Sequence, residues 1–191
     1  RAQDVGLYAF GYNIPNNALS PALEKAIDLE PNVIRFTHQV DAFDFYGDRA
    51  SLTLSDGSSM SVDLVIGSDG RKSSTREAAR IGVRRWSYPQ SALVMNFAHT
   101  VPHHNVSTEF HTETGPFTQV PLPGLASSLV WVIRPEEAEA SMALDDVALG
   151  RRIETRMQSM LGTVTLLPGR QVYPLSARMP VSFGRSRVAL V

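Results

Sequence analysis

The sequence predicts a mixed α+β fold, in which an α/β portion is combined with a mixed β-sheet that carries flanking helices. Its 191 residues are 43% hydrophobic and 19% charged, which is typical of a globular chain with a sizeable core. Segments rich in alternating or β-branched apolar residues dominate, and three helix signals lie among them. An apolar strand also runs into a tight turn at Asp69-Gly70, as in the α/β class.

The N-terminal third contains one predicted helix followed by strands. The helix is expected to begin at Ser20-Pro21, a serine cap with proline at the first helical position, and to end before Pro31. Asp56-Gly57 is a turn signal between two strand-like segments. A β-meander is therefore predicted over residues 33–66, with strands at 33–37, 42–46, 50–54 and 60–66.

The remainder is predicted to be rich in strands with two more helices. A short helix is expected at 74–81, and a longer one begins at Asp145-Asp146 and stops at Gly162. A composition shift near residues 85–90 indicates a boundary between two structural units. The predicted strands are 92–99, 108–112, 118–122, 128–133, 164–167, 172–175 and 188–191.

Composition excludes several function classes. The formal net charge of −1 removes the electrostatic case for a nucleic-acid or anionic-membrane binder. The absence of cysteine excludes disulfides, thiolate catalysis and Cys-ligated metals. The longest apolar runs, such as Leu129–Ile133, are far shorter than the roughly 20 residues that span a bilayer.

The ends of the chain suggest an excerpt from a longer polypeptide. The sequence starts with Arg1 rather than Met, and it ends in the apolar run 188–191, which is typical of an unfinished buried strand. The alternative is a short protein whose last strand closes a sheet.

Histidines and aromatic residues offer weaker site candidates. His103, His104 and His111 are close in sequence, but neighbouring strand side chains point to opposite faces, so loop positions are favoured over a metal site. Phe97 and Trp131 could line an aromatic pocket, with core packing as the favoured alternative.

The strongest local signal lies in residues 63–76. Gly70 lets the backbone approach a ligand closely, and the Asp69 carboxylate can accept hydrogen bonds from sugar hydroxyls. Ser73 and the start of the next helix can face a phosphate, and Arg76 can bind an anion through two N–H groups. A plain strand–turn–helix link is the alternative, since Asp-Gly is common in turns.

This segment resembles the DG motif of the class A flavoprotein monooxygenases, the para-hydroxybenzoate hydroxylase superfamily. In that motif an apolar strand is followed by Asp-Gly, two residues, Ser, two residues and Arg, which Asp69, Gly70, Ser73 and Arg76 match. Residues 115–117 and 127–131 resemble the middle sheet of the ubiquinone-biosynthesis hydroxylase branch, and residues 173–175 and 187–191 resemble the run before its second flavin motif.

The chain departs from the family pattern in two ways. It lacks the dinucleotide fingerprint Gly-x-Gly-x-x-Gly and the second flavin motif Gly-Asp-Ala-Ala-His. Asn17 occupies the position where members often carry a flavin-contacting arginine, which puts a phosphate contact there in doubt.

The resemblance implies a domain plan and a set of binding residues. Residues 1–88 would form part of an FAD-binding domain, residues 89–185 a substrate-binding sheet, and residues 186–191 a strand that returns to the first domain. Arg76 would hold the loop or the phosphates. The residues that would bind FAD are Asp69, Gly70, Ser73, Arg76 and Asn17, and those that would bind substrate are Pro121, Phe97 and Trp131.

The activity that the resemblance implies is FAD-dependent hydroxylation of a phenolic ring, such as a ubiquinone precursor, with NAD(P)H and O2. The resemblance assigns no catalytic side chain and no metal ligand, because in this family the cofactor carries the chemistry. It also implies a cytoplasmic protein with peripheral contact at the inner membrane. The alternatives are a halogenase, epoxidase or reductase on the same scaffold, and a non-catalytic binding domain derived from it.

Overall fold

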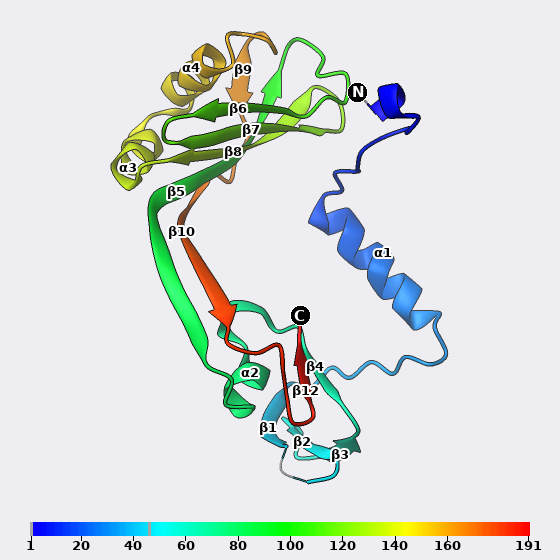
Figure 1. The fold of residues 1–191 in the computed structure, drawn as a ribbon. Coiled ribbons are helices and arrows are strands. Elements are labelled where there is room, and N and C mark those ends of the chain that lie inside the picture. The colour runs from blue at the N-terminus through cyan, green and yellow to red at the C-terminus, as the bar shows by residue number, and fades with distance from the viewer. Residues whose placement is uncertain (1, 46) are drawn as a thin grey trace. The chain divides into compact units, whose positions relative to one another are not determined.

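The computed structural model describes residues 2–45 and 47–191, which form two compact units (Figure 1). One unit contains residues 87–176 together with the N-terminal residues up to Ala18 and the short 3-10 helix η1 (Ala2–Val5). The other contains residues 19–86 and 177–191. Helices and strands are mixed along the chain, which confirms the predicted α+β class.

A six-stranded sheet is the centre of the first unit. Its strands run in the order β10-β5-β8-β7-β6, and β9 pairs with β5. The pairs β5–β8, β8–β7 and β7–β6 are antiparallel, and the four strands predicted between residues 92 and 133 are present, although β5, β7 and β8 begin before their predicted starts. The bounds are β5 (Val83–His99), β6 (Thr108–Thr112), β7 (Gly115–Leu122), β8 (Ala126–Ile133), β9 (Val164–Leu166) and β10 (Gln171–Pro180).

Two helices pack on one face of this sheet, α3 (Pro135–Ala143) and α4 (Asp146–Arg156). Burial alternates along β7, over most of β8 and in the last part of β5, from Leu93 to His99, so every second side chain of these stretches points into the core beneath the helices. The cluster comprises Leu93, Met95, Phe97, Phe117, Leu129, Trp131, Ile133, Ala138, Leu149, Ile153, Met157, Leu161 and Val164.

The sequence prediction missed α3 and extended α4 too far. Pro135 at the first turn and the acidic Glu136 and Glu137 are the start signals that mark α3. The helix expected to reach Gly162 ends at Arg156, because Gln158 and Ser159 adopt positive φ values of 53° and 54°, outside the helical region.

In the second unit, β1 (Val40–Asp44), β2 (Ala50–Leu54) and β3 (Ser59–Val62) form an antiparallel meander. The predicted bounds of β2 are confirmed, and its residues Ala50, Leu52 and Leu54 are buried on one face. The strand predicted at 60–66 divides in two, because β4 (Val65–Gly67) leaves the meander. It pairs in parallel with β12 (Val188–Leu190), which pairs with β11 (Gly184–Arg185).

Two further sequence predictions for the N-terminal third are wrong. Helix α1 (Asn16–Asp28) begins before Ser20, and Pro21 lies inside it, which costs the helix one backbone hydrogen bond but does not end it. The strand expected at 33–37 does not form, because that segment has no partner strand among the described residues. The last residue of the strand predicted at 42–46, Tyr46, lies outside the described residues.

No helix in the described part of the chain is long and apolar enough to cross a membrane.

Candidate functional site

The strand–turn–helix segment predicted as a site follows the carboxyl end of β4. The 3-10 helix η2 (Gly70–Lys72) comes next, and then the five-residue helix α2 (Ser74–Ala78). Gly67 lets these elements approach each other, since a Cβ there would lie 3.0 Å from side-chain atoms of both Leu190 and Thr75. The sequence reasoning missed Gly67, although glycine at the end of an apolar strand is a signal of close backbone approach.

Asp69 is fixed by the start of α2. Its Oδ2 accepts hydrogen bonds from the Ser74 hydroxyl (3.2 Å) and from the Thr75 backbone N–H (3.0 Å). Partial burial raises the pKa of Asp69, but hydrogen bonds from the Ser73 hydroxyl and from Thr75 outweigh it and lower the pKa to about 2. The exposed Asp69 side chain is therefore a carboxylate, able only to accept hydrogen bonds, at any physiological pH.

Gly70 and Ser73 shape the turn. Gly70 has a φ of +76°, and a Cβ built on it would meet nothing within 4 Å, so the space beside its backbone is open. The Ser73 hydroxyl caps α2 by accepting a hydrogen bond from the Arg76 N–H at 2.9 Å. Ser73 therefore holds the loop, while Gly70 leaves room for a ligand to approach the backbone.

Arg76 is turned into the protein. Its side chain is buried, its Nη1 donates to the Arg71 carbonyl at 3.4 Å, and its Nη2 lies 3.5 Å from the Glu77 carboxylate. Of the two roles that the resemblance allowed, holding the loop is the one that these contacts of Arg76 support.

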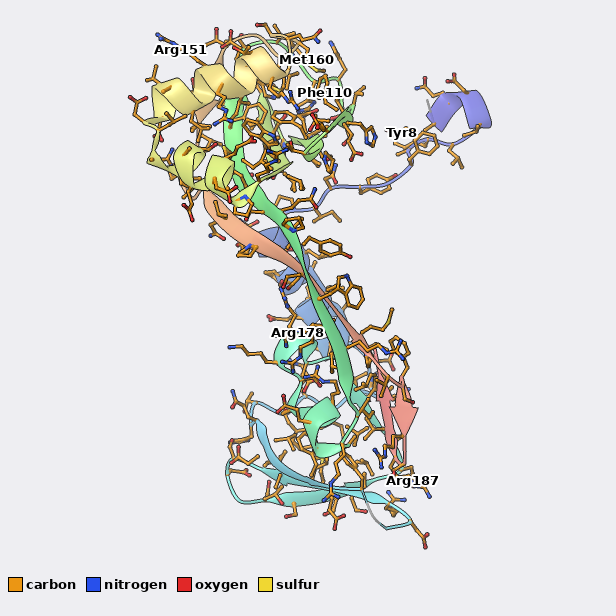
Figure 2. All side chains as sticks on the ribbon, turned by 60° about the vertical axis from the view of Figure 1, so that its left-hand side comes forward. Tyr8, Phe110, Arg151, Met160, Arg178 and Arg187 are labelled. Carbon is orange, nitrogen blue, oxygen red and sulfur yellow. The ribbon has the colours of Figure 1, made fainter. Side chains whose placement is uncertain are left out.

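Other arginines gather at the same loop. Arg178, labelled in Figure 2, donates from Nη1 to the Arg71 carbonyl at 2.8 Å across 107 residues of sequence. Desolvation and then the positive charges of Arg85, Arg71 and Arg76 lower the pKa of Arg178, whereas the nearby Glu77 carboxylate raises it. Sequence reasoning missed Arg71, Arg85 and Arg178, because nothing local indicates that they meet.

The three residues predicted to bind substrate lie on the helix-covered side of the sheet. Phe97 is 0% and Trp131 4% exposed, both in the core, and Pro121 is buried on β7. This placement matches the core-packing alternative given for Phe97 and Trp131. Asn17 lies in the first turn of α1 with an exposed side chain, and it belongs to the sheet unit rather than to the unit that contains the Asp69 loop.

The opposite face of the sheet carries its own pocket. Asn96 on β5 and Ser128 on β8 are directly paired neighbours with accessible side chains. Together with Leu122, which follows Pro121, and residues 12–16, they line a pocket of about 550 Å³. The same face also presents Val94, Thr118, Val120 and Val130, so the polar pair lies among mostly apolar side chains and can orient a small molecule with few polar groups.

The Asp69 loop offers three kinds of group together: an ionised acceptor, an open glycine backbone and clustered guanidinium groups. Sugar hydroxyls donate to carboxylates, and phosphates bind guanidinium groups. The loop therefore has the chemistry to hold the sugar–phosphate part of a nucleotide.

Comparison with known proteins also indicates a nucleotide cofactor. A family model described as FAD binding domain matches residues 8–191. Ubiquinone hydroxylase UbiL of Rhodospirillum rubrum is 37% identical over 144 residues, covering 75% of this chain and 34% of the relative. The 3-demethoxyubiquinol 3-hydroxylase of Escherichia coli is 30% identical over 191 residues, covering 100% of this chain and 49% of the relative. The chain thus spans between a third and a half of the length of these curated relatives.

Solved structures share the fold. Pseudomonas aeruginosa PqsL in complex with 2-aminobenzoylacetate superposes with a TM-score of 0.73 at 23% identity, covering 91% of this chain and 50% of that one. The flavin-dependent monooxygenase PieE in complex with FAD and substrate gives a TM-score of 0.63 at 18% identity, covering 94% and 33%. The match to the family model and the names of the relatives confirm the resemblance stated from the sequence.

Proposed function

The chain belongs to the FAD binding domain family, and on that premise we propose that the protein carrying it is an FAD-dependent monooxygenase that hydroxylates an aromatic ring. The observation that carries this proposal is the Asp69 loop, where an ionised carboxylate, an open Gly70 and several arginines lie together. The relatives named ubiquinone hydroxylase and demethoxyubiquinol hydroxylase support the reaction class.

The loop residues fit a flavin dinucleotide. The Asp69 carboxylate would accept hydrogen bonds from sugar hydroxyls, and the open side of Gly70 would let the backbone approach the phosphates. Arg71 and Arg178 would neutralise phosphate charge, while Ser73 and Arg76 hold the loop in shape. FAD would supply the redox chemistry, in which NAD(P)H is oxidised and O2 gives one oxygen atom to the ring and one to water.

The substrate in this proposal is a phenol of the ubiquinone-precursor class. The names of the two relatives favour that class. The pocket between Asn96, Ser128 and Leu122 would hold the ring, with the amide and the hydroxyl able to bind a phenolic oxygen. A substrate with a polyprenyl tail would bring the protein to the inner-membrane surface as a peripheral protein.

The domain plan is part of the same proposal. Residues 1–88 and 186–191 would contribute to the cofactor domain, and residues 89–185 would supply the sheet over the substrate.

Visible absorption spectroscopy of the complete protein tests the proposal. We expect bound oxidised flavin that NAD(P)H bleaches and air restores, with bleaching accelerated by the phenol that is the substrate. Asp69→Ala should lose flavin, whereas Asp56→Ala should retain it, because Asp56 belongs to the hairpin turn at Gly57, where its carboxylate accepts hydrogen bonds from Ser58 and lies 3.7 Å from His38. A wild-type protein that takes up no flavin, or two variants that retain it equally, would overturn the proposal.

A further inference from the structure

A second cavity lies at the outer edge of the sheet unit. It has a volume of about 790 Å³, is open to solvent, and is bordered by α4, by Glu137 of α3 and by the turn between β6 and β7, with Trp131 and Ile133 of β8 also in its wall. It lies on the helix-covered side of the sheet, whereas Asn96 and Ser128 point to the opposite face. We propose that this cavity binds an oxyanion, the phosphate or carboxylate group of a small molecule, as a site separate from those that serve the proposed hydroxylation.

Two buried donors in the cavity wall lack acceptors. The indole Nε1–H of Trp131 and the Nε–H of Arg156 are shielded from solvent, and neither finds a hydrogen-bond partner within residues 2–45 and 47–191. The Trp131 side chain is only 4% exposed. Buried N–H groups in folded proteins almost always have an acceptor in the protein or in ordered water, so these two donors leave room for an acceptor from outside the chain. Both groups can only donate, which requires a ligand with acceptor oxygens.

The charges around the cavity favour an anion. Arg152 is already used: its Nη1 donates to the Ser141 hydroxyl at 2.8 Å, its Nη2 lies 3.8 Å from Glu137, and its guanidinium stacks 5.0 Å from the centre of the Trp131 ring. Arg152 and Glu137 therefore compensate each other.

The remaining charges leave a positive excess. Arg151 and Arg156 line the cavity opposite a single further acid, Glu113, which is exposed on the β6–β7 turn and screened by water. Arg151, labelled in Figure 2, extends outward from α4 and has no ion-pair or hydrogen-bond partner in the described part of the chain. Its guanidinium is thus available to an anion bound in the cavity.

The spacing along α4 explains how one helix supplies these groups. Arg152 and Arg156 are four residues apart and share a face beside the buried Leu149 and Ile153, while Arg151 lies on the adjacent outer strip. The guanidinium fork matches the oxygens of phosphate and carboxylate, which a lysine ammonium would bind only as a point charge.

Titration of the Trp131 indole resonance with inorganic phosphate, and separately with benzoate, tests the site in the complete protein. The resonance is assigned by its loss in Trp131→Phe, and Trp86, which lies in the other unit, serves as the reference. We expect one probe or both to move the Trp131 signal downfield with saturation while the Trp86 signal stays in place. Saturation by phosphate identifies a phosphate ligand, and saturation by benzoate identifies a carboxylate.

Charge variants provide the decisive comparison. Arg156→Gln should weaken the apparent affinity at least about tenfold, as expected for a lost charge-assisted hydrogen bond. The exposed Arg151→Gln should weaken it without touching the core, and the matched control Arg134→Gln, exposed and outside the cavity, should bind like the wild type. The proposal is wrong if neither probe shifts the indole signal, or if Arg151→Gln and Arg134→Gln titrate alike, which would identify an adventitious ion only.

Discussion

Replacing Asp69 by asparagine removes the negative charge of the proposed cofactor loop and keeps the shape of the side chain. The carboxamide oxygen can still accept a hydrogen bond from the Thr75 N–H, so the substitution isolates the contribution of charge. At pH 7 we expect Asp69→Asn to be less stable than the wild type and to bind flavin more weakly.

The size of the stability effect follows from the pKa of Asp69, which lies at about 2 instead of 3.8. A shift of that size corresponds to at most about 2.5 kcal/mol of unfolding free energy at neutral pH. Because the side chain is exposed, solvent screening reduces the expected value to about 1 kcal/mol.

The sign of the pH dependence is fixed by the direction of the shift. The pKa is lowered in the folded state, so the stabilisation is complete above pH 3.8 and is lost as the pH falls through about 2. The difference between wild type and Asp69→Asn should therefore be constant from pH 7 to about pH 5 and should fall to about half by pH 3.

Urea unfolding at pH 7, 5 and 3 measures this difference. Asp41→Asn is the matched control, because the Asp41 side chain is exposed on β1 and forms no hydrogen bond or ion pair with another residue that the structure describes. It should shift the unfolding midpoint little at any pH. A difference for Asp69→Asn that stays constant or grows on acidification would show that the loop does not stabilise the carboxylate, and the reasoning would fail.

Three further substitutions test the fold around the two units, each by thermal or urea denaturation. Gly115→Ala should cost about 2–3 kcal/mol, since φ is 141° and the new Cβ would lie 2.6 Å from Val132 Cγ1; a neutral result would contradict this close approach. Gly67→Ala should cost about 1–2 kcal/mol and reduce bound flavin, because the Cβ would lie 3.0 Å from Leu190; unchanged flavin content would speak against a link between this packing and the loop. Asp145→Ala should cost about 1 kcal/mol, because the Asp145 carboxylate accepts a hydrogen bond from the Ala148 N–H in the first turn of α4 at 2.7 Å. Asparagine caps helices as well as aspartate does, so the same loss in Asp145→Asn would show that the cap is not the cause.

Elements whose signals are local could be predicted from the sequence. The bounds of β2 and β6 and the capping role of Asp145 follow from alternation and from a single side chain next to the backbone that it bonds. The Asp69-Gly70 turn is predictable for the same reason, since strand, turn and helix cap lie within a few residues of one another.

Elements that depend on distant partners could not be predicted. Residues 33–37 have strand-like composition, yet a strand forms only where another strand can bond to it. The face on which Phe97 and Trp131 lie is likewise decided by the two helices that pack on the sheet, one of which the sequence did not reveal.

The arginines at the cofactor loop include residues of the local sequence motif and one residue that only the fold brings close to it. Arg76 belongs to the sequence motif, but burial and its contacts to the Arg71 carbonyl and Glu77 commit its guanidinium to the protein. Arg178 lies outside the motif, is exposed, and uses one of its five N–H groups to bond the same Arg71 carbonyl. In the proposed function Arg76 is therefore a positioning residue that keeps the loop in shape. The phosphate contacts would come from Arg71, which lies within the motif, and from Arg178, which only the fold brings to it.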